Sequence, residues 1–465
     1  MALLKKYLGI IFCAITLTCA ILSIIHCAKK IAYIKFLADT SSAPHLNTDF
    51  KFYVDAGQRY QTTGEIYERP SGDETIVDKY YPMAPIFKFP PAFQLQIIPF
   101  INSWSPETLQ RLRITMIIGY LLSCLLLIAK CSSEMIKEKQ PKINIFLFSS
   151  LAAIPAVLNP GFWDCVLNAN YEILIFCFLV FGLLLLEKNT AFFAAIIGYL
   201  AITKIYPVFM ASLLLVTPSK KQAIAAFIVS ILFFSLMALL AFGLQENLYY
   251  AKSILPVISR EKVAPMQFSL SFGSELFRLT QNLEFSRIAF QILRSLLIII
   301  SFFLLVKYQA PRRNLIFFAL LMTLMLICLP NYWISYWIML FPAFCIAIRR
   351  VITRKQTMEA AVLFLCVIVT IVESQTWQHF QAPIWLNDNH RLDAIGSKIS
   401  AAYIQGLEAQ AFFLFLSHYP LTVVLYLLEQ LKFLVPIALW VFVAIEIVST
   451  ATQPTSSNPE RYKRA

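Results

Sequence analysis

Residues 45–99 read HLNTDFKFYVDAGQRYQTTGEIYERPSGDETIVDKYYPMAPIFKFPPAFQLQIIP, a polar stretch within a chain that is otherwise largely apolar. It is rich in acids, tyrosines, glycines and prolines, and it follows the first long apolar run and precedes all the others. Proline lacks a backbone N–H and restricts the residue before it, so no long helix is expected between Tyr81 and Pro91. The stretch predicts a folded polar loop that ends in a stiff, aromatic-rich hairpin.

The chain around this loop has the composition of a helical membrane protein. Of its 465 residues, 59% are hydrophobic and 14% are charged. Apolar runs near the roughly 20 residues that cross a bilayer recur along it, and within lipid the backbone must satisfy itself by forming helices. The short alternating segments of a membrane barrel are not visible. We therefore expect an all-α integral membrane protein of about 12 transmembrane helices, with a long first outer loop.

The expected spans occupy the apolar runs on either side of the loop. Two short runs, 191–203 and 206–217, meet at Lys204, and we expect them to be tilted helices that join near the outer boundary. Residues 411–430 are apolar but contain a proline, so we assign them to the membrane interface. The other spans are expected at 7–27, 112–129, 143–158, 171–186, 223–242, 288–306, 358–372 and 433–448, with two more ending near residues 330 and 349.

Charge sets the expected orientation. The net charge is +13, but the basic residues lie in short clusters between helices, as the positive-inside rule describes. This pattern argues against a nucleic-acid partner and places both termini in the cytoplasm, with Lys5 and Lys6 inside, and we expect a bacterial inner (plasma) membrane. The expected organisation is one polytopic domain (1–449) and a disordered tail (450–465). Its outer loops span residues 28–110, 245–287 and 375–410.

The polar residues gather in the outer loops, which favours chemistry at the membrane surface. A coupled transporter more often places carboxylates near the midplane. Moving a sugar from a polyprenyl phosphate needs a carboxylate to take the proton of the acceptor hydroxyl and a cation to meet the leaving phosphate. The first loop offers Asp49 and Asp55, and Lys204 and Arg278 are expected on the same side.

Two groups of residues stand out in the first loop: Asp49-Phe50, Tyr53, Ala56-Gly57, Gly64 and Tyr67, and then Tyr81-Pro82, Phe89-Pro90-Pro91-Ala92-Phe93 and Pro99. A third group is the AITKIYP segment around Lys204, and a fourth is QFSL at 267–270 followed by Arg278. In this order the four groups resemble motifs of the glycosyltransferase family 87 enzymes, which belong to the polytopic GT-C superfamily. Asn170, Glu172 and Tyr332 stand at places where that family also has polar segments, although the segments differ in identity.

The resemblance implies a GT-C-like helical bundle and a hexosyltransferase that uses a polyprenyl-phosphate-linked sugar, often mannose. It implies that Asp49 is the general base, that Lys204 contacts the donor phosphate, and that the anomeric centre is inverted. Its partners would be membrane lipids, the lipid-linked donor, and a glycan, lipid or protein acceptor, with no cofactor and no metal. The substrate-binding candidates are Lys204, Arg278, Asp55, Asn170, Glu172 and Tyr332.

Other interpretations of the same residues remain open at this point. The chain could be a lipid-linked-sugar flippase or another transporter, or an inactive relative that acts as a scaffold. Asp49 could cap a helix, Lys204 could extend from a helix end toward water, and Arg278 could contact lipid headgroups. Asp55 could be a surface residue, and Tyr332 could belong to the aromatic belt at the membrane interface.

Overall fold

A computed structural model of the chain describes residues 49–72, 89–186, 188–217, 219–259, 269–280, 282–310, 313–332, 334–371, 428 and 431–451. Within these ranges every regular element is a helix, as the composition predicts. The expected first span, the third outer loop, most of residues 411–430 and nearly all of the tail lie outside the described residues.

Five helical segments in the described part are long and apolar enough to cross a membrane. They are α6 (Pro106–Lys137), α11 (Lys220–Tyr249) with its continuation, α14 (Leu283–Lys307), η5 (Ile334–Leu340) joined to α16 (Phe341–Arg354), and α22 (Leu434–Ala451). A sixth candidate is the pair α7 (Lys142–Val157) and α8 (Pro160–Leu167), which is bent by 42°. The chain is therefore an integral membrane protein.

Five shorter apolar helices accompany them: α9 (Glu172–Leu186), α10 (Thr190–Thr203), η2 (Tyr206–Val216), α15 (Asn314–Ile327) and α17 (Thr357–Ile371). The described helices do not confirm the expected number of about 12 transmembrane helices or the GT-C arrangement. The expected pair of short helices around Lys204 is confirmed, because α10 ends at Thr203 and η2 begins at Tyr206.

Two boundaries differ from the expected ones for local reasons. The residues after Asn159 lie between the expected spans 143–158 and 171–186, yet they form α8. The Asn159 side chain accepts from the Gly161 N–H at 2.9 Å, and Pro160 suits a first helical turn. Helix α11 continues past residue 245 as far as Tyr249, although Gly243 bends it with a φ of +73°. It is followed by η3 (Tyr250–Ile254) and α12 (Leu255–Ser259).

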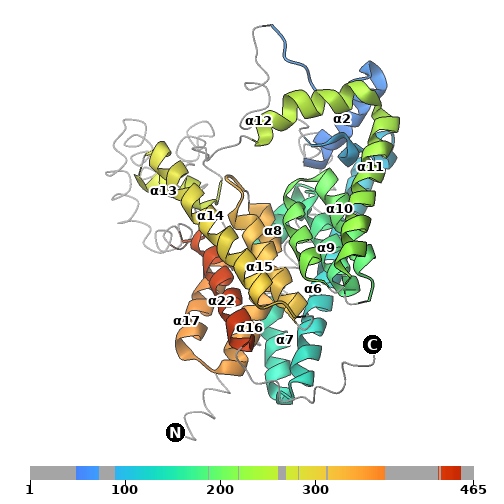
Figure 1. Cartoon of the computed structure of the whole chain (residues 1–465). Coiled ribbons are helices and arrows are strands. Elements are labelled where there is room, and N and C mark those ends of the chain that lie inside the picture. Colours follow the sequence, from blue (N-terminus) through green and yellow to red (C-terminus); the bar gives the residue numbers. More distant parts are fainter. Residues whose placement is uncertain are drawn as a thin grey trace, which may run out of the picture.

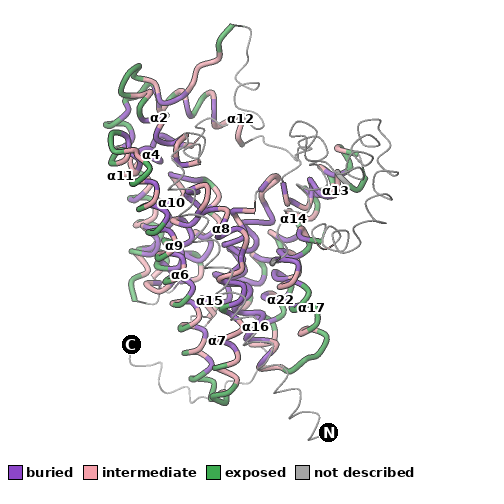
Figure 2. Tube along the Cα trace, turned by 180° about the vertical axis from the view of Figure 1, so that it is seen from behind, coloured by how far each residue is buried: buried purple, intermediate pink, exposed green. Residues whose placement is uncertain are grey.

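The core of the bundle lies around α15 and α16. Every residue of α15 from Leu315 to Ile327 is buried, and Figure 2 shows buried segments concentrated there while α11 and α17 expose much of their length. Close packing is also visible between α10 and α11. A Cβ atom on Gly198 would lie 2.7 Å from the Phe227 carbonyl oxygen, so only glycine allows this approach.

The described part of the first loop forms short helices at one end of the bundle. Helix α2 (Asp49–Thr63) lies at the end opposite the α6–α7 turn, where α12, from the second expected outer loop, also lies (Figure 1). The C-terminal part of the loop contains α4 (Pro91–Gln94) and α5 (Ile98–Ile101). Most of the segment expected to form an aromatic hairpin, residues 73–88, lies outside the described residues.

A carboxylate of α11 holds the chain that follows α2. Glu246, which is 2% exposed, accepts a hydrogen bond from the Ile66 N–H at 2.8 Å and from the Tyr67 N–H at 3.4 Å. The Arg69 guanidinium pairs with the same carboxylate, and its carbon lies 3.4 Å from the centre of the Tyr249 ring. The loop is thus attached to α11 beyond the bend at Gly243.

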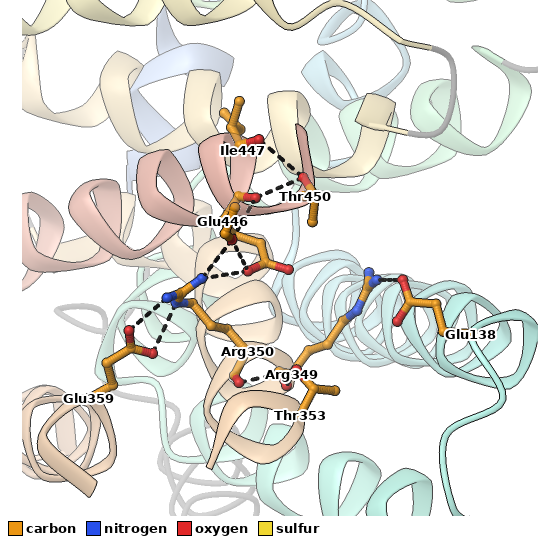
Figure 3. Close-up of polar contacts among 9 residues, drawn as sticks. Glu138, Arg349, Arg350, Thr353, Glu359, Glu446, Ile447 and Thr450 are labelled. Atoms are coloured by element: carbon orange, nitrogen blue, oxygen red, sulfur yellow. Dashed lines mark hydrogen bonds and ion pairs between the residues drawn. The ribbon is translucent and has the colours of Figure 1, made fainter. Parts of the chain in front are cut away.

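At the other end of the bundle, two consecutive arginines of α16 point in opposite directions (Figure 3). Arg349 pairs with Glu138 of the α6–α7 turn. Arg350 bonds to Glu359 of α17 at 2.7 Å and to Glu446 of α22 at 2.8 Å. Both arginine side chains are buried, so these charges are stable only because they are paired. The two side chains join three neighbouring helices to α16.

Candidate active site

Asp49 is the first residue of α2, and it contacts the turn between α8 and α9 through both backbone and side chain. Its N–H donates to the Asn168 carbonyl oxygen at 3.0 Å, and its Oδ2 accepts from Asn170 Nδ2 at 2.7 Å. The next residue, Phe50, stacks on Trp104 with ring centroids 5.3 Å apart. The start of α2 is thus fixed to the end of the bundle, and the half-buried Asp49 carboxylate has a defined position.

The turn that receives Asp49 ends one helix and begins the next. The Asn170 N–H donates to the Cys165 carbonyl at 2.7 Å, and the intervening Ala169 has a φ of +47°, a conformation that residues with a side chain seldom adopt. Asn170 Oδ1 accepts from the Glu172 N–H at 3.0 Å and so caps α9. The geometry of the turn therefore sets where both Asn170 and Glu172 lie.

Lys204 lies between α10 and η2 and pairs with Glu172. The chain is extended at Lys204, with φ −142° and ψ 126°, so the residue leaves the α10 helix and its side chain reaches the start of α9. The Lys204 ammonium donates to Glu172 Oε1, and the Tyr206 hydroxyl donates to Oε2 of the same carboxylate. The Lys204 and Glu172 side chains are 5% and 0% exposed. A buried charged group is costly unless it is paired, and here the two side chains are each other's partners.

Three aromatic rings also surround the Lys204 ammonium. Its nitrogen lies 4.7 Å from the centre of the Phe89 ring and 5.9 Å from the centres of the Tyr206 and Tyr336 rings. Ring faces within about 6 Å attract a cation, most strongly where water is excluded. This cluster brings together the first loop, the α10–η2 junction and the helix η5.

The environment of Asp49 perturbs its acidity. Burial, the largest effect, raises the pKa of Asp49 above the ordinary value for aspartate. The positive charge of Lys204 and the hydrogen bond from Asn170 lower that pKa, and the negative charge of Glu172 raises it again. Asp49 is thus close enough to the Lys204–Glu172 pair to feel both charges. A carboxylate whose pKa is shifted toward neutrality accepts a proton more readily than a solvated one.

Four of the residues expected to form the site come together. Asp49, Asn170, Glu172 and Lys204 form one connected cluster, as the hydrogen bonds and the ion pair described above show. Asp55 does not join them. It forms an ion pair at 2.7 Å with Lys51 one turn earlier in α2, and its side chain is 40% exposed, which corresponds to the surface role considered for it.

Tyr332 and Arg278 belong to the next part of the chain. The Tyr332 carbonyl accepts from the Leu270 N–H at 2.9 Å, which joins the segment before α13 (Phe272–Thr280) to the turn after α15. The Tyr332 side chain is 2% exposed and so is more buried than an aromatic residue of the interface belt would be. Arg278 lies in α13, and its side chain is outside the described part of the structure.

Sequence reasoning did not assign roles to the aromatic residues around Lys204. Tyr206 was visible two positions after the lysine, but nothing in the sequence indicated that its hydroxyl would meet Glu172. Tyr336 follows Tyr332 by four residues, and the structure places Tyr336, rather than Tyr332, next to Lys204. Among the described residues, no three His, Cys, Asp or Glu side chains gather into a group that could hold a metal ion.

A family model for glycosyltransferase family 87 matches residues 87–330, just over half of the chain. The protein belongs to glycosyltransferase family 87. The matched residues contain Asn170, Glu172 and Lys204, whereas Asp49 precedes them. The structure nevertheless attaches Asp49 to the matched part of this family 87 chain by two hydrogen bonds. No curated protein and no solved structure matches the chain.

Proposed function

We propose that this family 87 glycosyltransferase moves a hexose, such as mannose, from a polyprenyl-phosphate donor to a hydroxyl group of a glycan, lipid or protein. Asp49 is the general base. The observation that supports this proposal best is the position of the Asp49 carboxylate, which the α8–α9 turn holds beside the buried Lys204–Glu172 pair. That arrangement provides a proton acceptor and a cation within one cluster.

The reaction is a single displacement at the anomeric carbon. The acceptor oxygen forms a bond to that carbon while its proton passes to Asp49, and the bond from the carbon to the phosphate oxygen breaks with its electron pair. The polyprenyl phosphate leaves with the negative charge. One base is enough for this inverting reaction, whereas a retaining enzyme would use a second carboxylate as a nucleophile. Glu172 is a poor nucleophile here because Lys204 and Tyr206 already bind its two oxygens.

The leaving phosphate is stabilised by the ammonium of Lys204. In the structure this ammonium is paired with Glu172, so the phosphate of the donor either joins the pair or takes the place of the carboxylate. Interactions with developing negative charge are strong in a site from which water is excluded. Tyr206 and Tyr336, whose rings lie against the ammonium, offer aromatic surface for a sugar ring. No metal ion is required in this scheme.

The site faces the non-cytoplasmic side of a bacterial inner membrane. Helix α2, which begins at Asp49, lies at the end of the bundle opposite the α6–α7 turn (Figure 1). That turn contains Lys139, and Lys142 follows it as the first residue of α7. Basic turns favour the cytoplasmic side. With this orientation both termini are cytoplasmic, and the lipid-linked donor reaches the cluster from the outer leaflet.

The experiment compares Asp49→Asn with Asp55→Asn in proteoliposomes supplied with radiolabelled polyprenyl-phosphate mannose and a membrane extract as acceptor source. Loss of a general base typically costs about 10²–10⁴-fold in rate, so we expect Asp49→Asn to fall into that range. Asp55→Asn should remain within about twofold, because Asp55 forms only a partly exposed ion pair on α2.

Full transfer by a well-expressed Asp49→Asn protein would contradict the assignment of the base. Movement of the labelled lipid across the bilayer without any new glycosidic bond, unchanged by Asp49→Asn, would indicate the flippase instead. Activity with a different polyprenyl-phosphate sugar would retain the mechanism and correct the hexose.

A further inference from the structure

The amide of Asn170 makes two hydrogen bonds that fix which of its ends faces Asp49. The oxygen accepts from the Glu172 N–H at 3.0 Å, and the nitrogen donates to Asp49 Oδ2 at 2.7 Å. A backbone N–H can only donate, so the amide oxygen must be the end that meets Glu172. The amide nitrogen is therefore left for Asp49, and the start of α9 sets the orientation of the side chain.

We infer that Asn170 is a positioning residue for Asp49, rather than a residue that binds substrate. Its N–H holds one carboxylate oxygen and leaves the other oxygen of Asp49 to take the proton of the acceptor. This inference rests on the proposed role of Asp49 as the base. It differs from the sequence-based expectation, in which Asn170 was a substrate contact.

The inference also concerns the charge state of Asp49. A hydrogen bond donated to a carboxylate favours its ionised form, and a base must be ionised to act. The positive charge of Lys204 acts in the same direction, whereas burial and the negative charge of Glu172 oppose it. Within the described ranges, Asp49 also interacts with three other titratable groups: Asp164 and Cys165 of α8 and Tyr53 of α2. Asn170 is an uncharged neighbour that supports ionisation through a direct bond.

Two substitutions separate the two bonds of the amide. Serine and aspartate both cap helices well, so Asn170→Ser and Asn170→Asp each keep an acceptor for the Glu172 N–H. Serine is too short to serve both partners, so it removes the donor to Asp49. Aspartate removes the donor and places a second negative charge against Asp49, as in paired carboxylates. The two variants therefore share a cap but differ in what they present to the base.

The experiment measures kcat/KM against pH for both variants, together with thermal unfolding in detergent. Asn170→Ser should shift the acidic limb of the profile upward by about one pH unit, because a lost hydrogen bond raises the pKa of Asp49. Asn170→Asp should shift it further and lower kcat at neutral pH at least tenfold. KM for the lipid-linked donor should remain within about twofold, since the phosphate is not contacted by Asn170 in this scheme.

The matched control is Asn189→Ser. Asn189 caps α10 in the same way, accepting from the Phe192 N–H at 3.0 Å, but it lies at the other end of that helix from Lys204. This variant should leave the pH profile unchanged. If the acidic limb stays in place for both Asn170 variants while Asp49→Asn is inactive, the positioning role is wrong and the base remains. If Asp49→Asn itself is active, the proposed function fails first.

Discussion

Lys204 and Glu172 form an ion pair in which both side chains are almost completely buried, at 5% and 0% exposure. Removing two charges from water costs free energy. Their mutual attraction offsets this cost only when the geometry is good and additional hydrogen bonds are made. Tyr206 supplies one such bond to Glu172. The pair therefore stabilises the junction between α9, α10 and η2, in addition to the catalytic role proposed for Lys204.

Removal of one member of this pair should destabilise the protein more than removal of both. Lys204→Met leaves Glu172 as an unpaired buried carboxylate, which typically costs about 3–5 kcal/mol. The double variant Lys204→Met with Glu172→Gln has no buried charge and should recover most of the thermal stability without recovering transfer activity. Thermal unfolding in detergent measures this, with the exposed Lys188→Met as the control. Equal unfolding temperatures for the single variant and the wild type would contradict the pairing.

As the pH falls, transfer activity should be lost at a higher pH than it would be if the base were an aspartate with an unperturbed pKa. Burial raises the pKa of Asp49, and the protonated carboxyl cannot accept a proton. kcat/KM should therefore rise with pH through a midpoint above about 4, the value for an unperturbed aspartate. A profile of kcat/KM between pH 4 and 8 measures the midpoint. An unchanged profile in Asp49→Glu would speak against this residue as the source of the limb.

Glu246 should control how firmly the chain after α2 is attached to α11. Glu246→Gln replaces a charged acceptor with a neutral one, so the Ile66 and Tyr67 amides should exchange with deuterium about tenfold faster. Hydrogen–deuterium exchange read by mass spectrometry over residues 60–72 measures the effect. The control is Glu65→Gln. Glu65 also pairs with Arg69, but the distance from Arg69 Nε to the Glu65 carboxylate is 3.5 Å and the Glu65 side chain is 43% exposed, so this pair is weak. Equal exchange in both variants would show that Glu246 does not hold this segment.

Arg350 should matter for stability at the end of the bundle remote from Asp49. In Arg350→Ala the buried Glu446 carboxylate loses the guanidinium that lies 2.8 Å from it, and the free energy of unfolding should fall by about 3–5 kcal/mol. The variant should unfold at a lower temperature while its KM for donor stays within about twofold. Lys137→Ala, at an exposed position in the same region, is the control. A change in KM without a change in unfolding temperature would contradict a purely structural role.

The sequence supports accurate predictions where a pattern is local. Apolar runs predict the helices, because a backbone within lipid must satisfy its own hydrogen bonds. The interruption at Lys204 predicts the pair of short helices on either side of it. The resemblance to family motifs likewise selects Asp49 and Lys204. It draws attention to Asn170 and Glu172 by their place in the chain, although their segment differs from the family's, and the structure brings all four together.

Other features depend on contacts between distant segments and could not be predicted from sequence. Glu172 and Lys204 were each expected to bind substrate, and their pairing is visible only when α9 and the end of α10 are placed side by side. Asp55 was a candidate for binding substrate, but it pairs instead with Lys51, which lies one turn earlier in α2. The sequence Asn159-Pro160-Gly161 is typical of a turn, so it did not predict that Asn159 would cap α8.

Gly198 lies a little under two helical turns before Lys204, and its position predicts the result of a genetic screen. Even a methyl group there would meet the Phe227 carbonyl and force α10 away from α11, carrying the lysine with it. A random-mutation screen for lost transfer would therefore recover changes at this glycine beside changes at Asp49. Their shared phenotype would reflect a displaced ammonium in one case and a missing base in the other.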